Sequence, residues 1–148
     1  MIIVEDTRNQ VGKHDILNKQ LQDMGHQVIR NKLYVGDYAK LMDQTVCIDT
    51  KKDIQELYGN ICGKQHERFR NECIRALEAK ISLIILIEEQ TPIQRWKKPT
   101  KGKFKAHNGN DGEILYKAMT TMHQKYGVQF RQCSKTQTAQ VIIDLLKE

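Results

Sequence analysis

The sequence predicts an α/β protein with a central mixed β-sheet that is flanked by helices on both sides. Strand-like and helix-like apolar patterns alternate along the 148 residues, which is typical of this fold class. The run 82–87 is apolar without alternation, as expected of a central strand covered on both faces. A hydrophobic content of 39% is enough for one core, and no repeat or linker appears, so we expect a single domain over residues 1–148.

The first half of the chain is expected to hold a strand, a helix, a second strand and a β-hairpin. The helix ends at Gly25, and the hairpin turns at Asp43 and Gln44. The elements are, in order, a strand at 2–5, a helix with Ile16, Leu17, Leu21 and Met24 on its apolar face, a strand from Val28, and hairpin strands at 33–41 and 45–49.

The second half is expected to continue with helices and strands in turn. A helix over 114–122 is stopped near Gly127, and the closing helix has Ser134 or Thr136 as its N-cap. The other elements are helices at 53–60 and 65–80, the central strand at 82–87 and a strand at 128–131. Helical residues expected to face the core include Phe69, Cys73, Ala76, Leu77, Ile114, Leu115, Ala118, Met119 and Met122.

The sequence shows no sign of export or of membrane insertion. Its longest apolar run, 81–87, is far shorter than the roughly 18 residues that a membrane span needs, and the N-terminus lacks a basic region and a cleavage site. We therefore expect a cytoplasmic protein.

The four cysteines form no C-x-x-C pair and are expected to be reduced core thiols, since their spacing does not support the alternative of a zinc site with His26 or His66. They are Cys47, Cys62, Cys73 and Cys133.

Positive charge is concentrated between residues 90 and 110. The net charge is +6, and this segment holds six basic and no acidic residues; the other 18 of the 24 basic residues equal the 18 acidic ones. Glycine and proline punctuate the segment, as in a loop. Such a loop could bind a phosphate backbone and stack a base on Trp96 or Phe104, whereas the alternative is a solvated loop that Trp96 anchors to the body. The basic residues are Arg95, Lys97, Lys98, Lys101, Lys103 and Lys105.

Two aspartates and a lysine form the most informative polar pattern. Asp49 and Lys51 are two residues apart on a strand, so their side chains emerge on one face. A three-residue hairpin loop at 42–44 would place Asp37 directly opposite Asp49, whereas a loop of even length would put the two acids on opposite faces. Asp6, after the first strand, is a further candidate.

Such a cluster has the composition needed for phosphodiester hydrolysis. Two carboxylates from neighbouring strands repel each other, and a divalent cation such as Mg²⁺ relieves that repulsion while it keeps several waters. The cation polarises the scissile phosphate and acidifies a water, and Lys51 can orient that water or neutralise developing charge. The alternative is an exposed ion pair of Asp49 with Lys51, worth less than about 1 kcal/mol, and spacing alone favours it because D-x-K is common by chance.

The motifs resemble a known nuclease family. The run Val35-Gly36-Asp37-Tyr38, followed about a dozen residues later by Ile48-Asp49-Thr50-Lys51 and a helix, resembles the signature of the XPF-type structure-specific endonucleases, which belong to the PD-(D/E)XK nuclease superfamily. The similarity continues in Val4–Asn9, in Arg68–Glu72 and in the strand Leu83–Glu88, and it covers nearly the whole chain.

The resemblance implies a restriction-endonuclease-like core and a role for each motif residue. Asp37 and Asp49 would be the ligands of Mg²⁺ or Mn²⁺, Asp6 an additional acidic ligand, and Lys51 the catalytic lysine. Several positions depart from the family signature, since Asp49 stands for a glutamate and Thr50 for an arginine. We expect Lys52 or Arg8 to supply the phosphate contact that this arginine would make. Asn9 stands for the acid after the first arginine, and the final aspartate position falls near Gln55, beside Glu56.

The resemblance also implies a function, namely endonucleolytic hydrolysis of DNA at flaps, forks or junctions in repair, recombination or replication. The helix-hairpin-helix module usual in the family is absent from these 148 residues, so DNA affinity would come from the core, from the basic segment, from a homodimer or from a partner. A bacterial or phage origin would suit such a small domain. The alternative is a catalytically inactive, nuclease-like DNA-binding or adaptor domain, and action on RNA is a third hypothesis.

Overall fold

Six strands form one sheet in the order β2-β1-β3-β4-β5-β6, in a computed structural model that describes residues 1–99 and 109–148. Only β3 is antiparallel to its neighbours, β1 and β4. β1 pairs in parallel with β2, and β5 pairs in parallel with β4 and β6. The strands are β1 (Ile2–Asp6), β2 (Gln27–Asn31), β3 (Tyr38–Lys40), β4 (Asp43–Lys51), β5 (Ser82–Ile87) and β6 (Gln129–Gln132). The predicted mixed central sheet is therefore confirmed.

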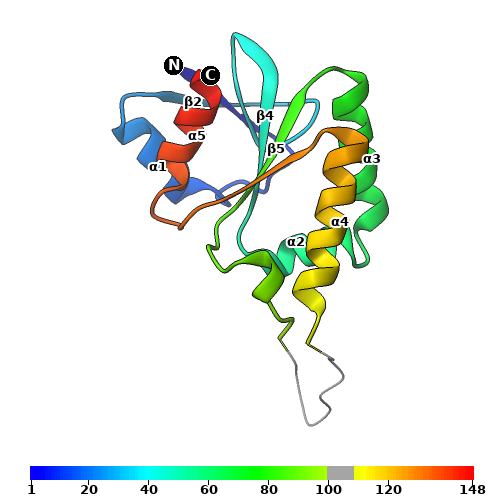
Figure 1. Cartoon of the computed structure of the whole chain (residues 1–148). Coiled ribbons are helices and arrows are strands. Elements are labelled where there is room, and N and C mark those ends of the chain that lie inside the picture. Colours follow the sequence, from blue (N-terminus) through cyan, green and yellow to red (C-terminus); the bar gives the residue numbers. More distant parts are fainter. Residues whose placement is uncertain (100–108) are drawn as a thin grey trace.

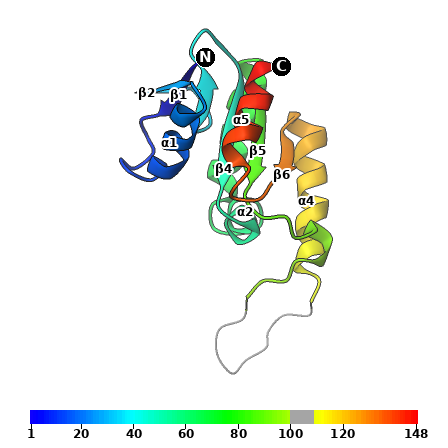
Figure 2. The ribbon, with the colours of Figure 1, turned by 90° about the vertical axis from the view of Figure 1, so that its left-hand side faces the viewer.

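Helices cover both faces of this sheet, as predicted (Figure 1). One face carries the first and last helices, which face the viewer in Figure 2, and the other face carries the remaining three α-helices. The helices are α1 (Asp15–Asp23), α2 (Ile54–Ile61), α3 (His66–Glu78), the short 3-10 helix η1 (Ile93–Arg95), α4 (Asp111–Tyr126) and α5 (Thr138–Lys147). No helix in the described part of the chain is long and apolar enough to cross a bilayer.

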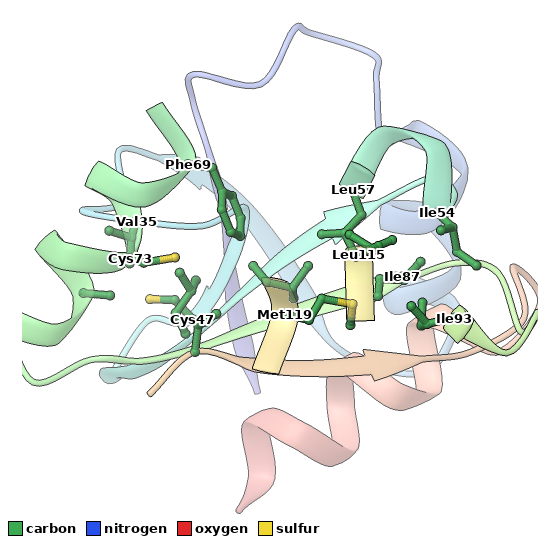
Figure 3. Close-up of a cluster of buried hydrophobic side chains, with 14 of the residues drawn as sticks. Val35, Cys47, Ile54, Leu57, Phe69, Cys73, Ile87, Ile93, Leu115 and Met119 are labelled. Atoms are coloured by element: carbon green, nitrogen blue, oxygen red, sulfur yellow. The ribbon is translucent and has the colours of Figure 1, made fainter. Parts of the chain in front are cut away.

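The sheet separates two apolar clusters. The larger lies under α2, α3 and α4 and includes Phe69, Leu57 and Met119 (Figure 3). The smaller lies under α1 and α5. Strand β5 is buried on both faces, as its unbroken apolar run predicts. All four cysteines are free, as predicted, and three of them are buried.

Four apolar residues expected in the core are instead exposed; three of them are immediately next to a buried residue in a helix, and the fourth, Met24, follows the last residue of α1. Neighbours on a helix differ by about 100° in direction, so the apolar stripe that reaches the sheet is narrower than the sequence pattern indicated. The exposed residues are Ile16, Met24, Leu77 and Ile114, whereas Leu17, Leu21, Ala76 and Leu115 are buried. The closing helix begins only at Thr138, because the hydroxyls of Ser134 and Thr136 bond to each other 3.0 Å apart and cap no helix.

The hairpin turns two residues earlier than predicted. Its turn is at 41–42, and β4 begins at Asp43, whose Oδ1 accepts hydrogen bonds from the backbone N–H and hydroxyl of Thr45 at 3.0 and 2.6 Å. A two-residue turn alone would give the wrong parity. However, a bulge in the ladder between β3 and β4 shifts the register, so Tyr38 pairs with Ile48, the pairing that the predicted three-residue loop would also have produced.

Candidate active site

A cavity of about 720 Å³ opens at the carboxyl end of β4, beside α3. All four predicted catalytic residues line it, namely Asp6, Asp37, Asp49 and Lys51. Each of these four is buried, with exposed fractions between 3% and 9%. The structure therefore brings together at one recess the groups that the sequence analysis selected from two separate strands and a loop.

Gly36 sets the position of Asp37. Its φ of +79° lies in the left-handed region that side chains disfavour, and a Cβ at this position would lie 3.1 Å from the carbonyl oxygen of Ile48. The Asp37 N–H donates to that same carbonyl at 2.7 Å. The ladder between β3 and β4 ends where Tyr38 pairs with Ile48, so Asp37, one residue before β3, lies beside the last residues of β4.

Thr50 holds the Asp37 carboxylate. Its backbone N–H and its hydroxyl both donate to Asp37 Oδ2 at 2.8 Å. Both bonds go to the same oxygen of Asp37, which also lines the cavity. The position of this carboxylate is thus fixed by β4.

Asp49 is the most strongly perturbed acid. Burial raises the pKa of this carboxyl well above its ordinary value, and the nearby Asp37, which repels it and also shares a side-chain hydrogen bond with it, raises the pKa further. Lys51 acts in the opposite direction but does not outweigh these effects. Without a further cation, the ionised form of Asp49 is therefore unfavourable in the folded protein.

Lys51 lies between the acids and α2. Its Nζ is 3.3 Å from Asp49 Oδ2 and donates to Asn60 Oδ1 at 3.3 Å, and it stands 5.8 Å from the centre of the Phe69 ring. Burial lowers the pKa of this amine, but Asp49, Glu72 and other acids outweigh burial and raise it overall. Lys51 is therefore a fixed positive charge beside the paired carboxylates.

Asp6 is already bonded on both of its carboxylate oxygens. Oδ1 accepts the Leu33 N–H at 2.8 Å, and Oδ2 accepts the Arg8 Nε–H at 2.7 Å. Arg8 also donates to the Leu33 carbonyl at 2.9 Å. Asp6 and Arg8 thus fix the segment that leads to Asp37, and Arg8 reaches the cavity as well.

The donor set fits a hard divalent cation bound by few protein ligands. In the described residues, no three His, Cys, Asp or Glu side chains converge on one point. Two convergent carboxylates, one with its pKa raised by the other, form a site whose negative charge Lys51 offsets only in part and a cation would relieve further. Magnesium commonly binds through one or two carboxylates and retains several waters, so Asp37 and Asp49 would suffice.

The raised pKa of Asp49 predicts how stability depends on pH and on cations. The folded protein holds the Asp49 proton more tightly than the unfolded chain does. Protonated Asp49 therefore adds fully to the free energy of unfolding at acidic pH, and this addition is lost as the pH rises through the raised pKa. Without divalent cations, Asp49→Asn should therefore melt at a higher temperature than wild type at pH 8, and the difference should shrink toward pH 5. Saturating Mg²⁺ or Mn²⁺ at about 100 times Kd should stabilise wild type by about 2.7 kcal/mol, or roughly 5 to 10 °C.

The matched control for this measurement is Asp144→Asn, which changes an exposed aspartate on α5. Differential scanning fluorimetry with chelated and cation-loaded samples would supply the melting temperatures. A difference between wild type and Asp49→Asn that stays the same at every pH, or an equal response of both proteins to the cation, would contradict the expectation.

The basic segment begins behind α2 rather than in the cavity. Trp96 is buried and its ring lies 5.3 Å from that of Tyr58 on α2, so it anchors the segment and is not free to stack on a base, which corrects the binding role considered for it.

Arg95, Lys97 and Lys98 are exposed, and the Lys98 ammonium lies 5.7 Å from the centre of the Tyr58 ring. The remaining predicted DNA contacts in this segment, Lys101, Lys103 and Lys105, and also Phe104, lie outside the described residues. Lys52 is exposed beside the cavity and is not part of its lining.

Several residues of the site were not predicted from the sequence. Glu72, on α3, lines the cavity and accepts the Gly36 N–H at 3.1 Å. On the opposite face of the sheet, the buried Glu5 lies 3.0 Å from His14 Nδ1, and His14 Nε2 lies 3.4 Å from the Thr50 hydroxyl that bonds Asp37. Nothing local in the sequence indicates this chain of contacts.

Comparisons with known proteins agree with this architecture. A protein-family model described as the ERCC4 domain matches residues 5–145. XPF from Aeropyrum pernix matches with a TM-score of 0.70 at 20% sequence identity, over 99% of this chain and 64% of that chain. XPF from Aeropyrum pernix in complex with DNA matches with a TM-score of 0.67 at 20% identity, over 99% of this chain and 63% of that chain. The chain therefore spans less than two thirds of the solved chains it matches, and a search of curated proteins found no match.

Proposed function

The chain belongs to the ERCC4 domain family, and from this premise we propose that it is a divalent-cation-dependent endonuclease that hydrolyses phosphodiester bonds in DNA. One observation carries the proposal, namely the buried pair Asp37 and Asp49 with the ammonium group of Lys51 at 3.3 Å from Asp49. Family and fold alone do not establish an activity, because function depends on the site. Here the site retains an acidic pair and a lysine in one recess.

Each residue has a proposed part in the reaction. Asp37 and Asp49 would hold Mg²⁺ or Mn²⁺, which when bound supplies Lewis-acid polarisation of the phosphate and a more acidic water. Lys51 would orient the attacking water or offset negative charge that develops on the phosphate. Asp6 would add negative charge near the cation, and its bonds to Arg8 and Leu33 favour a contribution through the position of neighbouring groups.

DNA is the proposed substrate because one of the matching structures is described as a complex with DNA, and because basic residues surround the cavity. Arg8 lines the cavity and would contact the phosphate next to the acids. Additional backbone contacts would come from the exposed residues Lys52, Arg95, Lys97 and Lys98. The other lysines of the basic segment, which lie outside the described residues, would add to them; they are Lys101, Lys103 and Lys105. The proposed substrates are flaps, forks and junctions formed in repair, recombination or replication, cleaved by a homodimer.

The test is incubation of the protein with labelled linear, flap, fork and four-way-junction DNA, and with RNA of the same shapes. We expect cleavage products from branched DNA that require Mg²⁺ or Mn²⁺ and disappear in a chelator. Absence of cleavage of every substrate at every cation concentration would overturn the proposal.

The second candidate function is an inactive nuclease-like domain that binds DNA. One observation favours it: within residues 1–99 and 109–148, no third His, Cys, Asp or Glu side chain joins Asp37 and Asp49 as a possible metal ligand. This candidate predicts salt-sensitive DNA binding without any nicking. The same incubation, followed by an electrophoretic binding assay, separates the two functions.

A further inference from the structure

Four basic side chains that line the cavity form no ion pair in the part of the chain that the structure describes. Arg8 and Lys51 are paired with Asp6 and Asp49, but these four are not. Two of them come from the segments that follow β1 and β2. The other two come from α3, on the face that also carries Glu72, because positions 68 and 75 are each about one helical turn from position 72. They are Lys13, Lys32, Arg68 and Arg75. Unpaired cations on both sides of an acidic recess are suited to bind the phosphates that flank a cleavage site.

An aromatic side chain lies among these cations. Tyr34 lines the cavity and is 53% exposed, whereas its neighbours Leu33 and Val35 are buried at 1% and 0%. The Tyr34 ring therefore lies outside the core, between two residues that are inside it. The ring makes no hydrogen bond and no ring contact with any described residue, so it offers a free aromatic surface.

The backbone that carries Tyr34 is held in place on both sides. Asp6 Oδ1 accepts the Leu33 N–H at 2.8 Å, and Arg8 donates to the Leu33 carbonyl at 2.9 Å. On the other side, the Gly36 N–H donates to Glu72 Oε1 at 3.1 Å. A ring on a fixed backbone loses little freedom when it binds, which favours its use in recognition.

Tyr34 and Asp37 are close enough for one nucleic acid strand to contact both. Asp37 is three positions after Tyr34, so their Cα atoms are at most about 11 Å apart. Both residues also line the same cavity. The cavity volume of about 720 Å³ is in the range of pockets that hold one small organic molecule.

We propose that Tyr34 is a stacking platform for an unpaired base next to the scissile phosphate, and that Lys13, Lys32, Arg68 and Arg75 bind the flanking phosphates. This proposal rests on the proposed function and specifies its substrate as a strand with unpaired nucleotides at the cavity. A base inside a duplex is covered by its neighbours on both faces, so only an unpaired or extruded base can stack on the ring.

The test measures binding separately from cleavage, in a chelator. Fluorescence anisotropy would compare a single-stranded oligonucleotide, the same sequence as a blunt duplex, and the duplex with an unpaired tail carrying 2-aminopurine. The variants are Tyr34→Ala, Tyr34→Phe and the matched control Tyr116→Ala, which removes a tyrosine of similar exposure (47%) on α4, outside the cavity. Melting curves would establish that each variant is folded.

We expect Tyr34→Ala to weaken binding of single-stranded and tailed DNA roughly 5- to 150-fold and to change duplex binding less than about twofold. Tyr34→Phe and Tyr116→Ala should bind like wild type. Stacking should quench 2-aminopurine in wild type and Tyr34→Phe but not in Tyr34→Ala. An equal loss on duplex and single strand, or no loss at all, would overturn the proposal.

The binding result is independent of the proposed nuclease activity. Stacking without any cleavage at any cation concentration would uphold the role of Tyr34 and refute the nuclease function. Cleavage of branched DNA with unchanged kcat, KM and binding in Tyr34→Ala would uphold the nuclease function and refute the role of Tyr34.

Discussion

Cleavage of branched DNA is expected to fall at least about 10²- to 10³-fold in Asp49→Ala and by a similar factor in Lys51→Met. Asp49 is the acid whose charge most needs a cation, because burial and Asp37 both raise its pKa. Lys51 is the ammonium group fixed against Asp49 at 3.3 Å. Methionine keeps the length and the apolar contact of the lysine side chain while it removes the charge.

The double variant distinguishes a joint role from two independent roles. Groups that act as a unit in one transition state lose most of their combined effect when either is removed. Asp49→Ala with Lys51→Met should therefore be slowed about as much as either single variant. Single-turnover rates at saturating enzyme, with all four proteins compared on one fork substrate, measure this coupling.

Binding should respond differently from cleavage. Asp49→Ala removes a negative charge next to the phosphate, so DNA affinity in a chelator should stay the same or increase. The matched controls are Asp144→Ala and Lys135→Met, both exposed and outside the cavity, which should cleave like wild type. Equal cleavage by wild type, Asp49→Ala and Lys51→Met would refute the proposed reaction.

The arrangement of the acids shows how far a local pattern can predict a site. The two-residue period of a strand placed Asp49 and Lys51 on one face, and the structure has them 3.3 Å apart. The predicted three-residue loop gives the observed pairing of Tyr38 with Ile48, although the turn itself was wrong. The alternation pattern contains neither the compensating bulge nor the bonds of Asp43 to Thr45 that follow the turn.

The sequence pattern did not predict the residues that distant segments contribute to the site. Glu72, Arg68 and Arg75 reach the cavity because α3 packs beside the segment around Gly36, a contact about 36 residues apart in sequence. The role of Trp96 depended on burial, which composition alone could not decide. Helix amphipathicity identified most core residues but overestimated the width of the buried stripe at Ile16 and Leu77.

A buried acid on the opposite face of the sheet is expected to have the largest effect on stability. Glu5 is 1% exposed and lies 3.0 Å from His14 Nδ1, while Asn18 and Arg30 each donate to its carboxylate at 3.1 Å. Removing one partner of a buried charged cluster leaves the other polar groups without compensation. Glu5→Gln keeps the size of the side chain but removes the charge that these donors face.

The expected loss in Glu5→Gln is about 2 to 4 kcal/mol in the free energy of unfolding, below the full value for a buried pair because the Arg30 side chain is 32% exposed and can regain water. The melting temperature should fall by roughly 5 to 15 °C. Urea unfolding would measure the free energy, with Glu67→Gln on the exposed side of α3 as the matched control. The same cluster continues through His14 and Thr50 to Asp37, so the variant should also cleave DNA more slowly at temperatures where it remains folded. Identical urea midpoints for Glu5→Gln and Glu67→Gln would show that this cluster does not stabilise the fold.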